Sequence, residues 1–184
     1  MADDVIELIK QDHREIERLF EQLDRHQPRR PLLKPMLIAL LIAHDRAEEE
    51  TVYPAAREAG ADELIARGQR AHLMAEDLLD KMTRVDADDA AFDTLLTQLS
   101  DVVTGHVKLE ESELLPALEE RLDAERRRSL AAVFIRSRTM HYGELPLNRR
   151  VAVLRQQAYN AGLVGISDLG KSDLEDLLYK LSAS

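Results

Sequence analysis

The chain has 184 residues, of which 45% are hydrophobic, 33% charged and 4% aromatic, a balance that favours helices over strands. It contains no cysteine, which excludes disulfide bonds, thiolate zinc sites, iron–sulfur clusters and a cysteine nucleophile, so any metal must be held by His and carboxylate side chains. The net charge is −10 and the acidic excess falls on residues 1–120, which argues against an extended nucleic-acid surface there, while the arginine-rich stretch 121–155 leaves a local one open.

The N-terminal segment is acidic and lacks the basic and then apolar layout of a signal peptide. The longest apolar run, residues 36–43, has eight residues and is too short to cross a membrane. We therefore expect a soluble, cytoplasmic protein without membrane contact.

The first predicted helix starts at an Asp3 or Asp4 cap and carries apolar residues at alternating spacings of three and four, with His13 on the same stripe. The proline-containing segment 26–31 ends it. Three further amphipathic helices follow, over about 37–55, 65–82 and 92–116, and each again places a histidine on its buried stripe. This pattern predicts an all-α protein with an antiparallel up-down-up-down four-helix bundle and a small C-terminal helical appendage.

An internal repeat supports the bundle. The segment 44–55 (HDRAEEETVYPA) aligns without gaps on 106–117 (HVKLEESELLPA), and both share a histidine, two successive glutamates and a Pro-Ala pair. The offset between the segments is 62 residues, and His13 precedes His72 by a similar 59 residues. The chain therefore resembles a duplicated helix pair, in which two equivalent sets of side chains are related by a pseudo-two-fold axis.

Each repeat offers a metal ligand pair, because residues four apart lie one turn apart on the same helical face. This applies to His44 with Glu48 and to His106 with Glu110. With His13 and His72, four histidines and two glutamates converge on the core, and either glutamate could bridge two cations through its two oxygens. The nitrogen and oxygen donor set suits iron or manganese, and a cation would offset the cost of burying the carboxylates.

The order His13, His44-x3-Glu48-Glu49, His72, His106-x3-Glu110-Glu111 resembles the hemerythrin-like HHE cation-binding family over about residues 4–120. The resemblance implies a bundle that holds two non-haem iron ions with an oxo or hydroxo bridge, manganese being the alternative metal. It also implies bridging roles for Glu48 and Glu110 and terminal ligand roles for the four histidines.

This chain departs from the oxygen-carrying hemerythrins, which use five histidines and have a second ligand four residues after the first on the third helix. That position is Glu76 here, which is either a seventh ligand or a solvated helix residue. We expect Glu49 and Glu111 either to contact the ligands from outside the ligand set or to lie at the surface. Tyr53 is expected to be a packing residue, and the alternative is that it donates a hydrogen bond next to the metal ligands. His26 and His141 are expected at the surface.

We predict two units, 1–141 for the bundle with its extension and 142–184 for the appendage. The tail resembles the helix–loop–helix modules of the Rho-N and SAP-like type, which often contact nucleic acid, and neighbouring arginines could supply phosphate contacts. Because the tail is acidic and has few aromatic residues, docking on the bundle or a protein contact is favoured over nucleic-acid binding.

These features together favour a diiron protein that binds or turns over dioxygen, hydrogen peroxide or nitric oxide. We expect catalase-like oxidoreductase activity in oxidative or nitrosative stress defence, because a carboxylate in place of the fifth histidine makes reversible oxygen carriage less suitable. The alternative is an iron- or redox-sensing module that acts on a protein or nucleic-acid partner through the C-terminal segment. The sequence leaves the oligomeric state open.

Overall fold

In the computed structural model, which describes residues 4–183, the chain is all-helical, as predicted. The segments that carry the bundle are α1 (Val5–Arg25), η1 (Gln27–Arg29), α2 (Arg30–Ala47), η2 (Glu48–Val52), α3 (Tyr53–Glu58), α4 (Asp62–Thr83), α5 (Ala90–Leu109), η3 (Glu110–Leu114) and α6 (Leu115–Arg121). They are followed by α7 (Ala124–His141), α8 (Val151–Asn160) and α9 (Lys171–Ser182). Every helix among the described residues is too short or too polar to span a bilayer.

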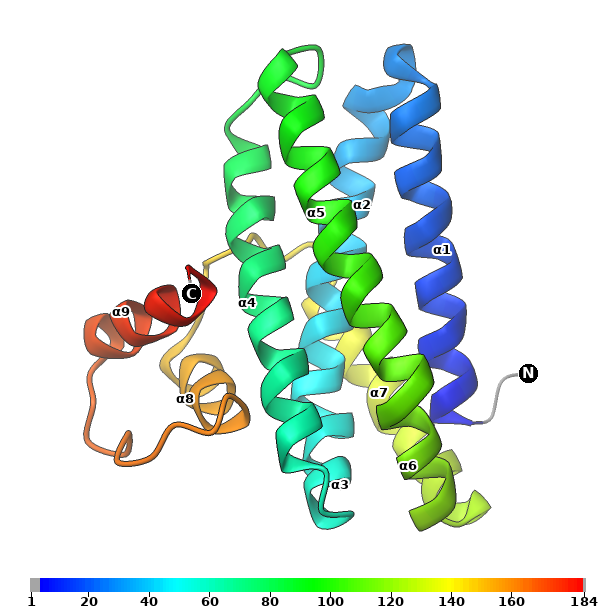
Figure 1. Cartoon of the computed structure of the whole chain (residues 1–184), viewed down its shortest axis with the longest axis vertical. Coiled ribbons are helices and arrows are strands. Elements are labelled where there is room, and N and C mark those ends of the chain that lie inside the picture. Colours follow the sequence, from blue (N-terminus) through cyan, green and yellow to red (C-terminus); the bar gives the residue numbers. More distant parts are fainter. Residues whose placement is uncertain (1–3, 184) are drawn as a thin grey trace.

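The long helices α1, α2, α4 and α5 run side by side along the long axis of the molecule (Figure 1). α7 is a fifth long helix that packs against α1 and α2. At the start of α1 the Asp4 side chain accepts a hydrogen bond from the Ile6 amide and so caps the helix. Asp3, the other candidate cap, lies outside the described residues. The proline-containing break between α1 and α2 is the short 3₁₀ segment η1.

Two apolar clusters fill the bundle at different heights. One contains Val5, Ile9, Tyr53, Leu118 and Phe134 and lies toward the start of α1. The other contains Ile16, Leu37, Leu79, Phe92 and Leu99 and lies toward the opposite end. The buried polar residues of the repeat lie between the two clusters. The core therefore holds a polar layer that is closed off from water on both sides.

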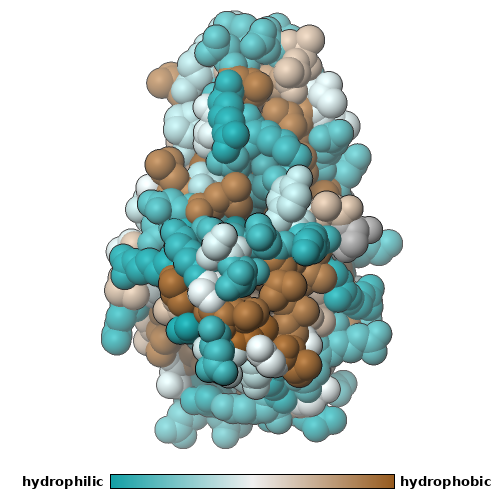
Figure 2. Space-filling view, turned by 90° about the vertical axis from the view of Figure 1, so that its left-hand side faces the viewer, coloured by the Kyte–Doolittle hydropathy of each residue, from teal (hydrophilic) through white to brown (hydrophobic). Residues whose placement is uncertain are grey.

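The C-terminal helices α8 and α9 pack on α4, at the left of Figure 1. Leu154, Leu174 and Leu178 form a small apolar cluster with Leu73 of α4, so the appendage shares a core with the bundle. Figure 2 shows this side of the molecule, where hydrophobic residues gather in the lower part and hydrophilic residues surround them. The appendage is thus docked on the bundle.

Candidate metal centre

Six side chains of the duplicated pattern converge in the polar layer of the bundle. His13 comes from α1, His44 from α2, His72 from α4 and His106 from α5, while Glu48 and Glu110 begin η2 and η3. None of the six is more than 7% exposed. Among the described residues they form two groups whose ligand atoms lie within 4.8 Å of one another, namely His13, His44, Glu48 and Glu110, and Glu48, His72 and His106.

Glu48 belongs to both groups because its two oxygens face different histidines. Its Oε1 lies 3.5 Å from Nε2 of His44, and its Oε2 lies 3.4 Å from Nε2 of His72 and 3.8 Å from Nε2 of His106. Glu110 has a similar position, with Oε2 3.3 Å from Nε2 of His13 and 3.5 Å from Nε2 of His106. Glu48 thus faces the histidines of both groups through different oxygens, whereas Glu110 faces His13 and His106 through the same oxygen.

The donor atoms at the centre make few hydrogen bonds of their own. Within residues 4–183, Nε2 of His13, Nε2 of His44 and both carboxylate oxygens of Glu48 and Glu110 are buried without one. Such atoms are costly to bury unless another group satisfies them. Nε2 of His72 and Nε2 of His106 lie only 3.0 Å apart. Inward nitrogen and oxygen donors of this kind fit divalent cations such as iron or manganese.

Both bridging-type glutamates stand at the start of a π-helical turn, a local widening of the helix that is frequent at functional sites. The amide of Tyr53 donates to the Glu48 carbonyl, and the amide of Leu115 donates to the Glu110 carbonyl, five residues back in each case. Pro54 and Pro116 follow these amides at equivalent positions of the repeat. Because proline lacks an N–H and clashes with the carbonyl four residues earlier, it opposes a regular α-helical turn there.

Carboxylates lie next to the outer nitrogen, Nδ1, of three of the four histidines. Asp12 lies 3.2 Å from Nδ1 of His44, Glu49 lies 3.4 Å from Nδ1 of His72, and Glu111 lies 2.9 Å from Nδ1 of His13. A carboxylate that accepts from Nδ1 fixes the ring orientation and leaves Nε2 as the donor to a metal. Glu49 is buried and Glu111 is partly exposed.

The pKa values of His44 and Glu48 show how the charges of the centre are balanced without a cation. Burial alone would lower the pKa of His44, but the charge of Glu48 and the hydrogen bond to Asp12 raise it to about 9. Burial alone would raise the pKa of Glu48, but His44, His106 and His72 hold it well below its usual range. Without a metal, a proton on His44 therefore compensates the charge of Glu48. A bound cation would take over this role and displace that proton.

Comparison with known proteins agrees with this geometry. A family model described as the hemerythrin HHE cation binding domain matches residues 4–118. The chain belongs to the hemerythrin HHE family.

Among curated proteins, this HHE chain is similar to a DNA nickase from Nostoc sp. (strain PCC 7120 / SAG 25.82 / UTEX 2576), with 27% identity over 135 residues. The matched region covers 70% of this chain but 37% of the nickase, so the chain spans well under half the length of that relative. No solved structure matches the chain. The HHE match ends before the C-terminal segment, and the resemblance of that segment to Rho-N and SAP-like modules gains no support from the comparisons.

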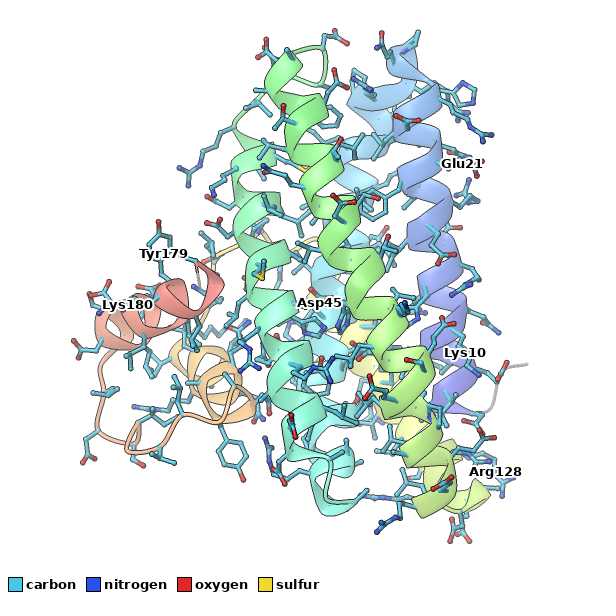
Figure 3. All side chains as sticks on the ribbon, in the orientation of Figure 1. Lys10, Glu21, Asp45, Arg128, Tyr179 and Lys180 are labelled. Atoms are coloured by element: carbon cyan, nitrogen blue, oxygen red, sulfur yellow. The ribbon has the colours of Figure 1, made fainter. Side chains whose placement is uncertain are left out.

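Two further groups of this HHE domain lie next to His72, namely Tyr53, for which a hydrogen bond near the ligands was the alternative expectation, and Asp45, which was not expected there. The Tyr53 hydroxyl is 3.2 Å from Nε2 of His72, and Oδ1 of Asp45 is 3.7 Å from the same atom. Figure 3 shows Asp45 in the interior of the bundle, whereas Lys10 and Glu21 point outward from α1. Burial raises the pKa of Asp45 to about 6 despite the nearby histidines. Its signal in the sequence is its place next to His44, as Asp12 stands next to His13.

Glu76 lies apart from the two groups. Its carboxylate is buried, pairs with Arg46 at 2.5 Å and accepts hydrogen bonds from the Leu147 amide at 3.0 Å and from Gln157 at 3.2 Å. Leu147 has a φ of +60°, a strained value for a residue with a side chain, so this contact anchors the connector between α7 and α8. Glu76 was expected either as a seventh ligand or as a solvated helix residue. In the structure it is buried, and its carboxylate faces Arg46 and not the two groups of donors.

The two remaining histidines differ from each other. His26 is exposed at the end of α1, as expected. His141 was expected at the surface, and this is wrong, because it is 9% exposed and its ring lies 3.0 Å from Glu50 and 3.1 Å from Glu144. It packs at the end of α7, where the chain turns toward the appendage.

A small cavity lies beside the four histidines and has a volume of about 10 Å³, close to the space that one water molecule needs. Besides the histidines and Asp45, its walls are apolar and consist of Ile16, Leu41, Ala71, Ala75, Val102, Val103 and Val107. The cavity is too small for an organic substrate.

Proposed function

We propose that this chain holds two iron ions between His13, His44, His72 and His106, with Glu48 and Glu110 as bridging ligands, and that it binds or turns over a small oxidant. The observation that carries the proposal is the placement of Glu48, whose two oxygens face different histidines and make no hydrogen bond among the described residues. Manganese is the alternative metal, since it accepts the same nitrogen and oxygen donors.

When bound, a pair of redox-active ions supplies electron transfer and open positions for a small ligand. The protein orients the ligand side chains and excludes bulk water from the centre. Asp12, Glu49 and Glu111 fix the imidazole rings through Nδ1 and direct Nε2 toward the centre. The apolar clusters above and below exclude bulk water and strengthen every charge interaction in the layer. Tyr53 and Asp45 are the groups near His72 that could donate or hold a proton.

Hydrogen peroxide is the oxidant that we favour over dioxygen and nitric oxide. Its disproportionation needs no organic substrate, because one molecule of peroxide oxidises another to give water and dioxygen. This suits a cavity of about 10 Å³ with apolar walls. Catalase-like turnover would serve defence against oxidative stress, and nitric oxide binding would serve defence against nitrosative stress.

The proposal is tested on freshly purified protein from iron-supplemented cells. Metal analysis should give two ions per chain, chiefly iron, and the near-ultraviolet and visible absorption should change when peroxide is added. Oxygen release should follow peroxide addition and should be absent in His72→Ala. One zinc ion per chain, or no metal, would overturn the diiron assignment. A stable, reversible dioxygen adduct without peroxide consumption would favour carriage instead.

A sensing role is the second candidate, and a specific contact favours it. Gln157 of α8 donates to Glu49, which in turn accepts from His72, so the appendage touches the surroundings of the centre directly. If metal occupancy controls a partner through this segment, capture of that partner should depend on iron. A DNA-directed activity is not part of this proposal, because the similarity to the nickase covers 37% of that protein.

The arrangement that supports these roles is proposed as an up-down-up-down bundle of α1, α2, α4 and α5, within a first unit of residues 1–141, followed by a second unit of residues 142–184. We further propose a cytoplasmic location, where a small oxidant would be reached by diffusion. Limited proteolysis and cell fractionation would test the unit boundary and the location.

A further inference from the structure

The carboxylate of Glu49 is enclosed by partners from three helices. Its Oε1 accepts from Gln69 of α4 at 2.6 Å and from Gln157 of α8 at 3.1 Å, and its Oε2 accepts from Arg46 at 2.9 Å. Asn160, also on α8, donates to the Glu49 carbonyl at 3.3 Å. Oε1 of Glu49 also lies 3.4 Å from Nδ1 of His72, so these partners hold in place the carboxylate that faces the His72 ring.

The equivalent residue in the other repeat has different surroundings. Glu111 accepts from Nδ1 of His13, but its side chain is 29% exposed and its further partner is Arg14 on the surface of α1. The pseudo-symmetric halves of the centre thus differ at this position, since one outer carboxylate faces solvent and α8 covers the other. Gln157 lies well beyond the HHE match, which ends at residue 118.

Gln157 is the central polar group of this cover and is itself fully buried. Its Oε1 accepts from Arg149 at 3.1 Å, while its Nε2 donates to Glu49 at 3.1 Å and to Glu76 at 3.2 Å. Arg46 and Arg149 balance the charges of Glu49 and Glu76, so a neutral amide can link the two carboxylates without adding an unpaired charge.

We infer that Gln157 is a positioning residue of the metal centre, which fixes Glu49 so that Glu49 holds the His72 ring with Nε2 toward Glu48. The appendage would then complete one of the two cation positions, the one formed by His72 and His106, and leave the position of His13 and His44 untouched. This inference rests on the metal centre proposed above. A carboxylate that orients a histidine ligand, as Glu49 does here, is worth about 10–100-fold in metal affinity.

The test is Gln157→Met, which keeps the length of the side chain and removes its hydrogen bonds. Metal-free full-length protein is titrated with Co²⁺ and followed by visible absorption, so that two binding steps are resolved. We expect one step to weaken by about 10-fold or more and the other to stay unchanged. The matched control is Leu174→Ala, which weakens the apolar core of the appendage without touching Glu49. It should lower the melting temperature and leave both affinities unchanged.

A second measurement does not depend on metal. In ¹⁵N spectra of the histidine side chains of the metal-free protein, the Nδ1 signal of His72 should shift in Gln157→Met, while that of His13 should not. If the wild type binds two Co²⁺ ions and Gln157→Met binds them equally well with an unchanged His72 signal, the inference is wrong and the metal centre stands. If the wild type binds fewer than two ions, the proposed centre itself fails. An equal loss of both steps in the two variants would mean that the appendage acts only through stability.

Discussion

The carboxylate of Glu111 lies 2.9 Å from Nδ1 of His13, and this contact repeats that of Glu49 with His72 on the other side of the centre. Glu49 and Glu111 are 62 residues apart, as are the two bridging-type glutamates that precede them. The duplication therefore includes the groups that orient the histidines as well as the histidines and glutamates themselves. Substitution of Glu49 should consequently affect the orientation of His72, and substitution of Glu111 should affect that of His13.

Loss of Glu48, which belongs to both groups of donors, should reduce metal binding more than loss of the surface residue His26. Glu48→Ala removes the group that faces both His44 and His72, so we expect the purified variant to retain at most one ion per chain. His26→Ala is the control, because His26 is exposed at the end of α1 and belongs to neither group of donors. Metal analysis by mass spectrometry checks both variants. A wild-type metal content in Glu48→Ala would contradict the bridging assignment.

Metal-free protein should lose stability as the pH rises from about 6.5 to about 9. The folded-state pKa of His44 is raised from 6.5 to about 9, so the folded state binds more protons than the unfolded state in this window. The stabilisation is complete below pH 6.5 and is lost as the pH rises through 9, at about 1.4 kcal/mol for each unit of pKa difference.

Urea denaturation at several pH values measures this effect. Iron-loaded protein should lack the trend in that window, because metal-bound imidazoles are already neutral. A metal-free protein whose stability rises over the same range would show that His44 is not held in its protonated form.

Gly68 is required by the close approach of α4 to Tyr53. A Cβ atom at this position would lie 2.5 Å from the Tyr53 hydroxyl oxygen, which has no room to move because the ring is fully buried. Gly68→Ala would otherwise favour the helix by about 1 kcal/mol. We expect it instead to lower the melting temperature.

The double variant Gly68→Ala with Tyr53→Phe tests the cause. Removal of the hydroxyl takes away the closest contact, so the second substitution should recover part of the lost stability. Thermal unfolding of the single and double variants measures the recovery. Additive losses would mean that the hydroxyl is not the obstacle.

Arg46 should contribute strongly to stability because it compensates two buried carboxylates. Arg46→Met leaves Glu49 without its guanidinium and Glu76 with only that of Arg149, and removal of one partner of a buried ion pair costs about 3–5 kcal/mol. Adding Glu76→Gln removes the charge of the carboxylate that has lost one of its two guanidinium partners, and it should restore part of this loss. Chemical denaturation of both variants provides the comparison, and a loss below about 1 kcal/mol in Arg46→Met would contradict a buried, compensating role.

The helical class and the convergence of the six donors could be predicted because both depend on regular spacing. His44 and Glu48 lie one turn apart in any helix, and the repeat brings His106 and Glu110 to the same height. The apolar stripe around His13 and His72 then directs both rings inward.

The surroundings of the centre could not be predicted in this way, because they depend on contacts between segments far apart in the chain. Glu76 stands at a helical position that faces the core, but Arg46 and the connector at Leu147 draw its carboxylate aside. Gln157 lies 108 residues from Glu49, and no local pattern links them. The burial of His141 likewise depends on Glu50, which is 91 residues away.

The π-helical turn that starts at Glu48 also determines which later side chain lies on the same side of the helix as Glu48. In a regular α-helix, a residue five positions along lies about 140° around the axis, so Tyr53 would point away from the side of Glu48. The hydrogen bond from the Tyr53 amide to the Glu48 carbonyl reduces this rotation and brings the phenol to His72. The same turn in the other repeat presents Leu115. A designed bundle that copied the histidines and glutamates onto regular α-helices would reproduce the donors but would lose the phenol. The Tyr53 phenol reaches the centre because the π-helical turn contains one more residue than an α-helical turn.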